Sequence, residues 1–414
     1  MENTIPATDT HSPTALRITL ICIAVSMIDG FDTLMLSFVA PLLVKSLQID
    51  HASLGRVFSA GFVGTVLGSF IVGPAADQFG RRRMLISALA VTGVLTLCCA
   101  FVHSATTLAA LRFVGGLGMG GAIPPVAAIA AENGETKYQS VRVILMSIGF
   151  PLGAVIGGAI SSVTMVQFGW ASVFVMGGAF ALIVILPVFF CIPRPSTRRA
   201  APLQGVAPRR PQRGYLFLQA FRAGRLPAIL ALWSGVLAIM ILSGFIVSFM
   251  PTILNLSGVP VGRAAFGVVV FNLGAITGAL SLSAVVVRAG PFIPVAVLFL
   301  AGGGLVFALG HLLEGGSAAF IVLFVAGACL VGGQLAFPAM ASQLFPEGVR
   351  AAGIGWTLGI GRGGSIIGPL VGGLLLSRLV PLKRVFMMAS TLALLAAACI
   401  ALAQIWLARI DDRR

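Results

Sequence analysis

Long apolar runs alternate with short polar segments along the whole chain. Each run is long enough to cross a bilayer as a helix, which takes about 20 predominantly apolar residues. The pattern therefore predicts an all-α polytopic membrane protein with twelve transmembrane helices. The expected limits are 17–40, 54–76, 84–103, 106–131, 140–163, 170–192, 228–250, 264–287, 291–312, 317–342, 351–377 and 384–408.

The predicted spans fall into two groups of six on either side of one long polar segment. We expect an N-terminal six-helix half at 1–192, a basic linker at 193–227 and a C-terminal six-helix half at 228–414. The linker holds eight arginines and no acid, which favours a position on the cytoplasmic membrane surface beside anionic lipid headgroups. Glycine-rich stretches in the fifth and eleventh spans form a weak internal repeat. Two such halves around a midplane site are typical of a secondary transporter.

Composition and charge exclude several function classes. The chain is 58% hydrophobic and 9% charged, whereas soluble domains carry about 25% charged residues. Its net charge of +15 does not indicate a nucleic-acid partner, because the basic residues lie between spans, where they set topology. With both termini inside, 19 of the 27 Lys and Arg residues fall on the cytoplasmic side, so we predict that orientation. The six cysteines and four histidines lack ligand spacing, so we expect no metal and no cofactor.

Two carboxylates lie deep in the first span. Asp29 and Asp32 are the only two of the twelve acids placed near mid-bilayer, and at spacing i, i+3 they share one helix face. An unpaired charge there costs roughly 2.5 kcal/mol or more, so such residues usually carry function. We interpret the pair as a proton-coupling or substrate site. The alternative is a structural pair satisfied by neighbouring hydroxyls and glycine backbone.

Two arginines are the corresponding deep cations. Arg362 lies near the middle of the eleventh span, between glycines, and Arg112 lies in the fourth span. Arginine stays charged and matches a carboxylate in bidentate fashion. Arg362 therefore indicates an anionic substrate, and Arg112 either a substrate or a coupling role. The competing explanation is internal, with one arginine neutralising Asp29 or Asp32.

The segment between the second and third spans carries the most specific motif. It reads Gly73-Pro-Ala-Ala-Asp77-Gln-Phe-Gly80-Arg81-Arg82-Arg83 and resembles the cytoplasmic signature of the major facilitator superfamily. The glycines permit a tight turn, and an Asp at a helix end can face the positive N-terminus of another helix. The resemblance implies a gating role for Asp77, Gly80 and Arg81.

Three further motifs narrow this resemblance to the aromatic acid:H+ symporter family. They are Asp29-Gly-Phe-Asp32, the segment from Arg112 to Pro124 followed by Glu132, and the segment from Arg350 to Arg362. The resemblance implies proton-driven uptake of aromatic carboxylates across a bacterial inner membrane by a monomeric transport unit. It makes Asp29, Asp32, Arg112, Glu132 and Arg362 the functional candidates. Our hypothesis is that Arg362 binds the carboxylate and that Asp29 and Asp32 hold or relay the proton, supported by Glu132. Arg112 either contacts the substrate or adjusts the protonation of the two acids.

An aromatic acid also needs an apolar slot beside a cation. The candidates within spans are Trp356, Phe245, Phe249 and Phe271. For each ring alone, packing or a lipid-facing position is favoured over substrate contact, so only the group as a whole is compatible with such a slot. The two tyrosines lie near loops, so ring hydroxyls would need other partners, for which Asn272 and Gln334 are candidates.

Two other functions remain open at this stage. The first is a proton antiporter that exports drugs or metabolites. The Gly364-x-x-x-Gly368-Pro369 segment resembles the antiporter signature of such exporters, but that signature belongs in the fifth span. The second is a membrane sensor that binds aromatic acids without transporting them. An enzyme is not expected, because no cluster of nucleophile, base and metal ligands is visible.

Overall fold

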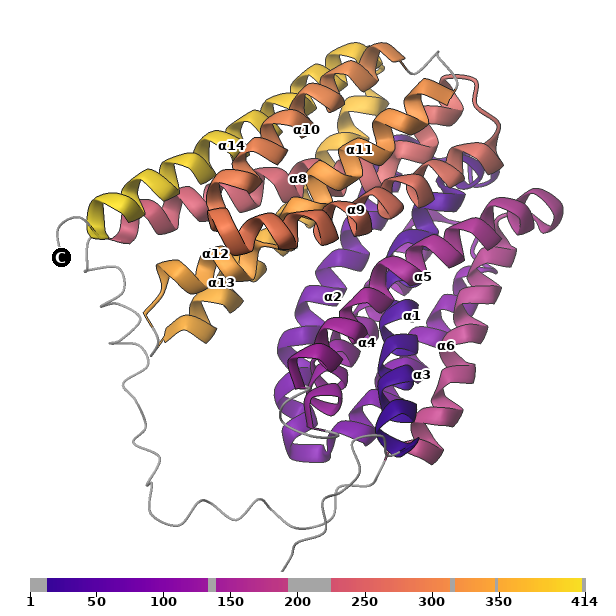
Figure 1. The fold of residues 1–414 in the computed structure, drawn as a ribbon. Coiled ribbons are helices and arrows are strands. Elements are labelled where there is room, and N and C mark those ends of the chain that lie inside the picture. The colour runs from indigo at the N-terminus through magenta and orange to yellow at the C-terminus, as the bar shows by residue number, and fades with distance from the viewer. Residues whose placement is uncertain (1–12, 133–138, 193–224, 313–316, 347–348, 412–414) are drawn as a thin grey trace, which may run out of the picture.

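The computed structural model describes residues 13–132, 139–192, 225–312, 317–346 and 349–411 (Figure 1). Twelve helical spans in this part of the chain are long and apolar enough to cross a membrane, which confirms the predicted all-α fold. The helices are α1 (Pro13–Ser46), α2 (His51–Phe79), α3 (Arg81–Cys99), α4 (Ala105–Glu132), α5 (Gln139–Phe168), α6 (Ala171–Cys191), α8 (Leu226–Leu256), α9 (Val261–Ala289), α10 (Phe292–Leu312), α11 (Ser317–Gln334), α12 (Phe337–Leu344), α13 (Arg350–Ser377) and α14 (Leu382–Asp411).

The tenth span is broken, where the sequence predicted one continuous helix over 317–342. It consists of α11 and α12, and a short turn separates them at residues 335–336. Pro338 lies in the first turn of α12. Because proline has no backbone N–H, it cannot continue the hydrogen-bond ladder of α11, but it is well suited to the start of a new helix.

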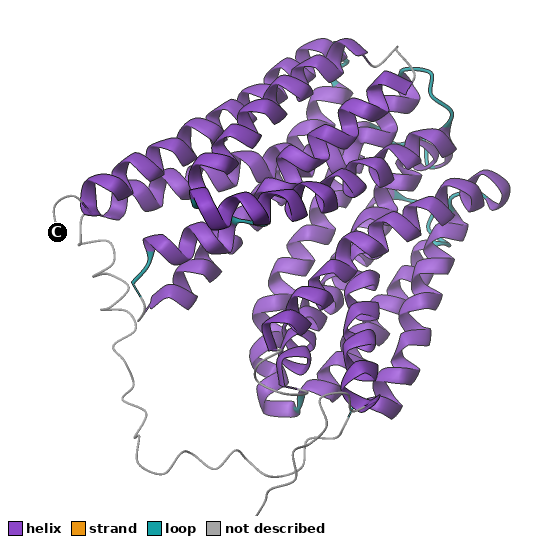
Figure 2. Ribbon diagram, viewed as in Figure 1, coloured by secondary structure: helices purple, strands orange, loops and turns teal. Residues whose placement is uncertain are grey.

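The helices form two groups, α1–α6 and α8–α14 (Figure 2). In the first group α2 packs on α4, α1 on α5 and α3 on α6. In the second, α8 packs on α13 and α14, α9 on α11, and α10 on α14. Most of the predicted linker, 193–227, lies outside the described residues.

Small residues let neighbouring helices approach closely. A methyl group at Gly64 of α2 would collide with the Phe113 carbonyl of α4, and one at Gly120 of α4 would collide with the Thr65 carbonyl of α2. Helices in a bilayer associate through such close packing, because lipid is as apolar as the side chains. The close contact between α2 and α4 helps to hold α4 next to α1.

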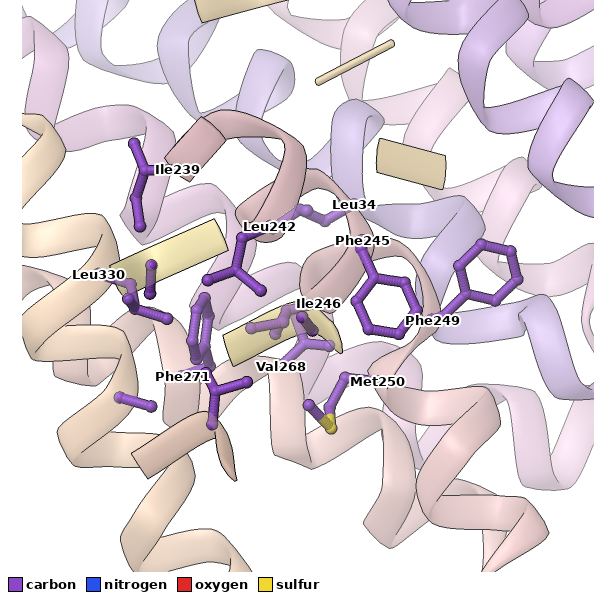
Figure 3. Packing of buried hydrophobic residues seen from close by; sticks show 14 of the residues in the cluster. Leu34, Ile239, Leu242, Phe245, Ile246, Phe249, Met250, Val268, Phe271 and Leu330 are labelled. Carbon is purple, nitrogen blue, oxygen red and sulfur yellow. The ribbon is translucent and has the colours of Figure 1, made fainter. Parts of the chain in front are cut away.

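The apolar core continues from one group into the other. Figure 3 shows Phe245 and Phe249 of α8 beside Leu34 of α1, and Phe271 of α9 among neighbouring aliphatic side chains. The ring of Phe58 in α2 lies 5.6 Å from that of Phe249, centre to centre. These rings therefore contribute to the packing between the halves.

Two hydroxyl groups bridge the halves at the end of the bundle away from the linker, which we call the sealed end. Ser37 Oγ of α1 donates to the Val247 carbonyl of α8 at 2.5 Å, and Ser59 Oγ of α2 donates to the Ile366 carbonyl of α13 at 2.7 Å. Pro251, four residues after Val247, has no N–H with which to engage that carbonyl. The missing helix hydrogen bond at Pro251 thus leaves the Val247 carbonyl as an acceptor for the opposite half.

The two groups diverge from the sealed end toward the end where α6 stops and α8 starts, which we call the linker end (Figure 1). One face of α13 contacts α2 at the sealed end through Ile366, Pro369 and Gly373. By helical spacing, Gly355 and Gly359 lie on the same face nearer the linker end. No atom of another described helix lies within 4 Å of where their side chains would begin.

A helix cap orders the start of α2 at the sealed end. The Asp50 carboxylate accepts a hydrogen bond from the Ser53 N–H at 3.0 Å. Hydrogen bonding from Ser53 lowers the pKa of the Asp50 carboxyl below its ordinary value. The cap therefore stays ionised and satisfies one of the free N–H groups at the helix start.

We predict that Gly55→Val in α2 opens the sealed end. A Cβ at Gly55 would lie 2.5 Å from the Pro369 carbonyl oxygen of α13. A valine side chain would therefore clash with α13 and keep the two halves apart at this end. In a background without the native cysteines, spin labels at Lys45 and Lys383, both exposed near this end, should report a longer distance.

The matched control is Gly304→Val in α10, where nothing lies within 4 Å of the added Cβ. Ser37→Ala should shift the same label distance less, because it removes one hydrogen bond worth about 0.5–1.5 kcal/mol. An unchanged distance distribution in Gly55→Val would contradict this account of the seal.

Candidate functional site

The centre of the first group contains a buried ion pair between α1 and α4. Arg112 Nη2 lies 2.7 Å from Asp32 Oδ2, and Arg112 Nη1 donates to Asp32 Oδ1 at 3.2 Å. Arg112 Nη2 also donates to the Asp32 backbone carbonyl at 3.0 Å. Asp32 is only 4% exposed and Arg112 only 6% exposed. This two-point geometry is the strong form of an arginine–carboxylate contact.

A threonine from a third helix completes this ion pair. Thr96 of α3 donates its hydroxyl to Asp32 Oδ1 at 3.0 Å, and the residue is buried. The sequence reasoning missed Thr96, because one threonine in an apolar span carries no distinguishing pattern. The sequence left open whether Arg112 contacts a substrate or neutralises one of the deep acids. In this conformation its guanidinium binds Asp32.

The second acid and the second arginine belong to different halves. Arg362 is exposed and lies on the α13 face that carries Gly355, Gly359 and Ile366. Asp29 of α1 is partly exposed and interacts electrostatically with Arg362 and with Asp32. Arg112 and Asp32 are thus in direct contact, and Asp29 lies within electrostatic range of Asp32 and of Arg362 in the other half.

The four residues predicted to line an aromatic slot do not lie together: three are buried in the core and one is exposed. Phe245, Phe249 and Phe271 are at most 5% exposed and pack in the core between α1, α8 and α9 (Figure 3). Trp356 of α13 is 56% exposed, and its ring lies 6.4 Å from the ring of Trp233 in α8. Of the four rings, only Trp356 is accessible in this conformation.

The two predicted amides bind protein groups. Asn272 of α9 is buried and donates to the Val268 carbonyl of its own helix at 2.9 Å. Gln334 at the end of α11 donates to Ser243 Oγ of α8 at 2.5 Å. Both side chains therefore stabilise the C-terminal half in this conformation.

The predicted gating motif lies at the turn between α2 and α3. Gly80 has φ +94° there, a backbone conformation that favours glycine, and its N–H donates to the Ala76 carbonyl at 3.1 Å. Next to the turn, Arg82 lies over the Phe189 ring and donates to the Phe189 carbonyl, which ties α3 to α6. The predictions for Asp77 and Glu132 concern side chains outside the described part of the structure, and that for Arg81 stays a prediction.

Comparison with known proteins agrees with these features. The profile of the Major Facilitator Superfamily matches residues 22–369. The chain is 31% identical to a 4-hydroxybenzoate transporter, PcaK, from Pseudomonas aeruginosa, with 88% of this chain and 87% of that protein covered. It is 32% identical to a gallate transporter from Pseudomonas putida, with 87% and 85% covered.

Among solved structures, a D-xylose-proton symporter has the same fold, with a TM-score of 0.74, 16% identity, and 93% of this chain and 97% of that chain covered. These relatives and this neighbour are transporters, in agreement with the prediction that the chain is not an enzyme. The motif around Asp77, the twelve spans and the match over most of the chain lead to one conclusion. The chain belongs to the Major Facilitator Superfamily, and the relatives that it matches along most of its length are transporters of aromatic acids.

Proposed function

We propose that the protein is a proton-coupled importer of small aromatic carboxylates, working by alternating access in a bacterial inner membrane. The observation that carries the proposal is that each half places one deep charge within electrostatic range of the other, Asp29 on α1 and Arg362 on α13. The names of the relatives, for 4-hydroxybenzoate and gallate, support an aromatic acid as the substrate.

Arg362 is the proposed carboxylate site. Its guanidinium is the exposed cation on the α13 face that borders the gap, and the fixed fork of five N–H donors fits a planar carboxylate. The neighbouring glycines leave room for a flat ring beside it. Trp356, exposed on the same helix, is our candidate for a stacking partner.

Asp29 is the proposed proton site, because it competes with the substrate for the same cation. A carboxylate that binds Arg362 removes the counter-charge from Asp29 and leaves two anions close together. Protonation of Asp29 relieves that repulsion, so proton and substrate each favour binding of the other. This reciprocal coupling is what a symporter requires.

Asp32 and Arg112 set the charge that Asp29 experiences. A bare Asp32 carboxylate one helical turn away would repel an ionised Asp29, and Arg112 neutralises it through a bidentate contact. We therefore assign Arg112 to the coupling network rather than to the substrate. Glu132 at the end of α4 remains a proposed member of this network.

The orientation follows from the charge distribution of the loops. If the basic linker and both termini are cytoplasmic, the linker end faces the cytoplasm and the sealed end faces outward. The described conformation is then inward-facing, with the carboxylate site accessible from inside. Asp77, Gly80 and Arg81 lie at the end that must close next, which fits their proposed gating role.

We predict that Arg362→Ala weakens binding of 4-hydroxybenzoate by roughly 10- to 100-fold. This range corresponds to the loss of a charge-assisted hydrogen-bond pair worth about 1.5–3 kcal/mol. Calorimetry on the purified protein measures binding, and uptake into proteoliposomes measures transport.

The matched control is Arg263→Ala, which removes the same charge from an exposed position at the start of α9. It should bind and transport normally. Normal binding by Arg362→Ala would show that the carboxylate site lies elsewhere.

We predict that Asp29→Asn separates substrate exchange from proton-driven accumulation. Asparagine imitates the protonated acid, so the variant should bind substrate with little dependence on pH and still exchange labelled for unlabelled substrate. It should not concentrate substrate when a pH gradient is applied. The wild-type protein should bind more tightly in mildly acidic than in mildly alkaline buffer, while the substrate stays ionised.

Asp50→Asn is the control for charge removal, because asparagine also caps helices well and Asp50 lies outside the spans. It should retain pH-driven accumulation. Accumulation by Asp29→Asn equal to that of the wild type would assign the proton to another group.

A further inference from the structure

A small recess opens between α1, α2 and α4, next to the buried ion pair. Its volume is about 20 Å³. The polar part of its wall comes from Asp32, Thr33, Thr65 and Arg112. The remaining wall is apolar apart from the backbone of Gly61, and includes two phenyl rings from α2.

The size of the recess fits one oxygen atom with its hydrogen. A buried water needs roughly 10–15 Å³ of such space and two to four polar partners. The space holds one water or one hydroxyl group, and it is too small for an aromatic ring. Its ligand must therefore be an O–H group that enters from the edge.

The polar groups of the wall match an O–H group in both directions. The Asp32 carboxylate accepts hydrogen bonds, and the threonine hydroxyls can donate or accept them. The Arg112 Nη groups are occupied by Asp32 and Met35, so Arg112 holds the carboxylate in place rather than binding the ligand. Both members of the ion pair are more than nine-tenths buried. Asp32 Oδ1 accepts from Arg112 and Thr96, whereas Oδ2 accepts from Arg112 and keeps a lone pair for a ligand. Thr65 also donates to the Gly61 carbonyl at 3.0 Å, which leaves its oxygen as an acceptor.

The recess lies close to the proposed carboxylate site. Thr33 is four residues after Asp29, so both lie on one face of α1, about 6 Å apart along the axis by the helical rise of 1.5 Å per residue. Asp29 in turn lies within electrostatic range of Arg362 in the other half. One helical turn is comparable to the length of a benzene ring with its substituents.

We propose that this recess binds a ring hydroxyl of the aromatic acid whose carboxylate Arg362 holds, so that Thr33 and Thr65 determine selectivity for hydroxylated rings. The inference rests on the proposed function. Water fills the recess when the ring carries no hydroxyl, and an ordered water replaces most of the lost hydrogen bonding. Benzoate therefore still binds, and the preference for a hydroxylated ring is moderate.

The test compares 4-hydroxybenzoate with benzoate in the full-length protein. Thr33→Val and Thr65→Val keep the side-chain shape and remove the hydroxyl. Each should lower the affinity for 4-hydroxybenzoate by roughly tenfold, the usual result of leaving a buried polar group unpaired, and leave that for benzoate unchanged. Thr391→Val, on an exposed position of α14 where the hydroxyl bonds its own helix, is the control.

A third variant fills the recess instead of changing its polarity. A Cβ at Gly61 would lie 3.8 Å from Arg112, which is an ordinary contact, so Gly61→Ala should fold normally and exclude the hydroxyl. It should again weaken binding of 4-hydroxybenzoate and spare benzoate.

The outcomes separate the two proposals. An unchanged ratio of the two affinities in all three variants would overturn the hydroxyl site while the carboxylate site stands. An equal loss of affinity for both acids would also overturn it, because the substitutions would then disturb the folded structure rather than a site for the ring hydroxyl. Failure of the wild-type protein to bind either acid would instead refute the proposed function.

Discussion

The first half of the protein depends on the burial of Asp32 and Arg112. Removing two charges from water costs several kcal/mol per ion, so the pair is tolerable only with good geometry and further hydrogen bonds. Arg112 supplies two donors to the carboxylate and a third bond to the Asp32 carbonyl, and Thr96 supplies another. Breaking one partner would leave a buried charge, so α1, α3 and α4 are held together as a unit.

Asp29 and Arg362 are also an acid and an arginine, but they are less buried than Asp32 and Arg112. Asp29 and Arg362 belong to different halves, and the helices that carry them diverge toward the linker end (Figure 1). A charge that faces a gap can exchange its partner for a ligand, whereas a charge inside a bundle cannot. In the proposed mechanism, the two acids one turn apart therefore have different roles, because the helices around them differ.

The sequence predicted the twelve spans, the family and the four deep charges, because each leaves a local pattern. It left open which arginine pairs with which acid, because the pairing depends on how closely α4 approaches α1 and α2. Glycines such as Gly64 and Gly120 permit that approach, and their contacts are with residues far away in the sequence. It also did not distinguish the buried Phe245, Phe249 and Phe271 from the exposed Trp356. In a membrane helix the lipid-facing and core-facing sides are both apolar, so hydrophobic periodicity carries little information.

The composition of the seal explains how such charges can control the whole molecule. The described contacts across the sealed end include hydroxyl-to-carbonyl hydrogen bonds and glycine-to-backbone packing, and each such bond contributes only about 1 kcal/mol. Helix contacts of this kind separate without exposing a charge to lipid. The difference in free energy between the two conformations is then small. In the proposed mechanism, a proton at Asp29 and a carboxylate at Arg362 shift this balance, because they interact differently with the two arrangements of the halves.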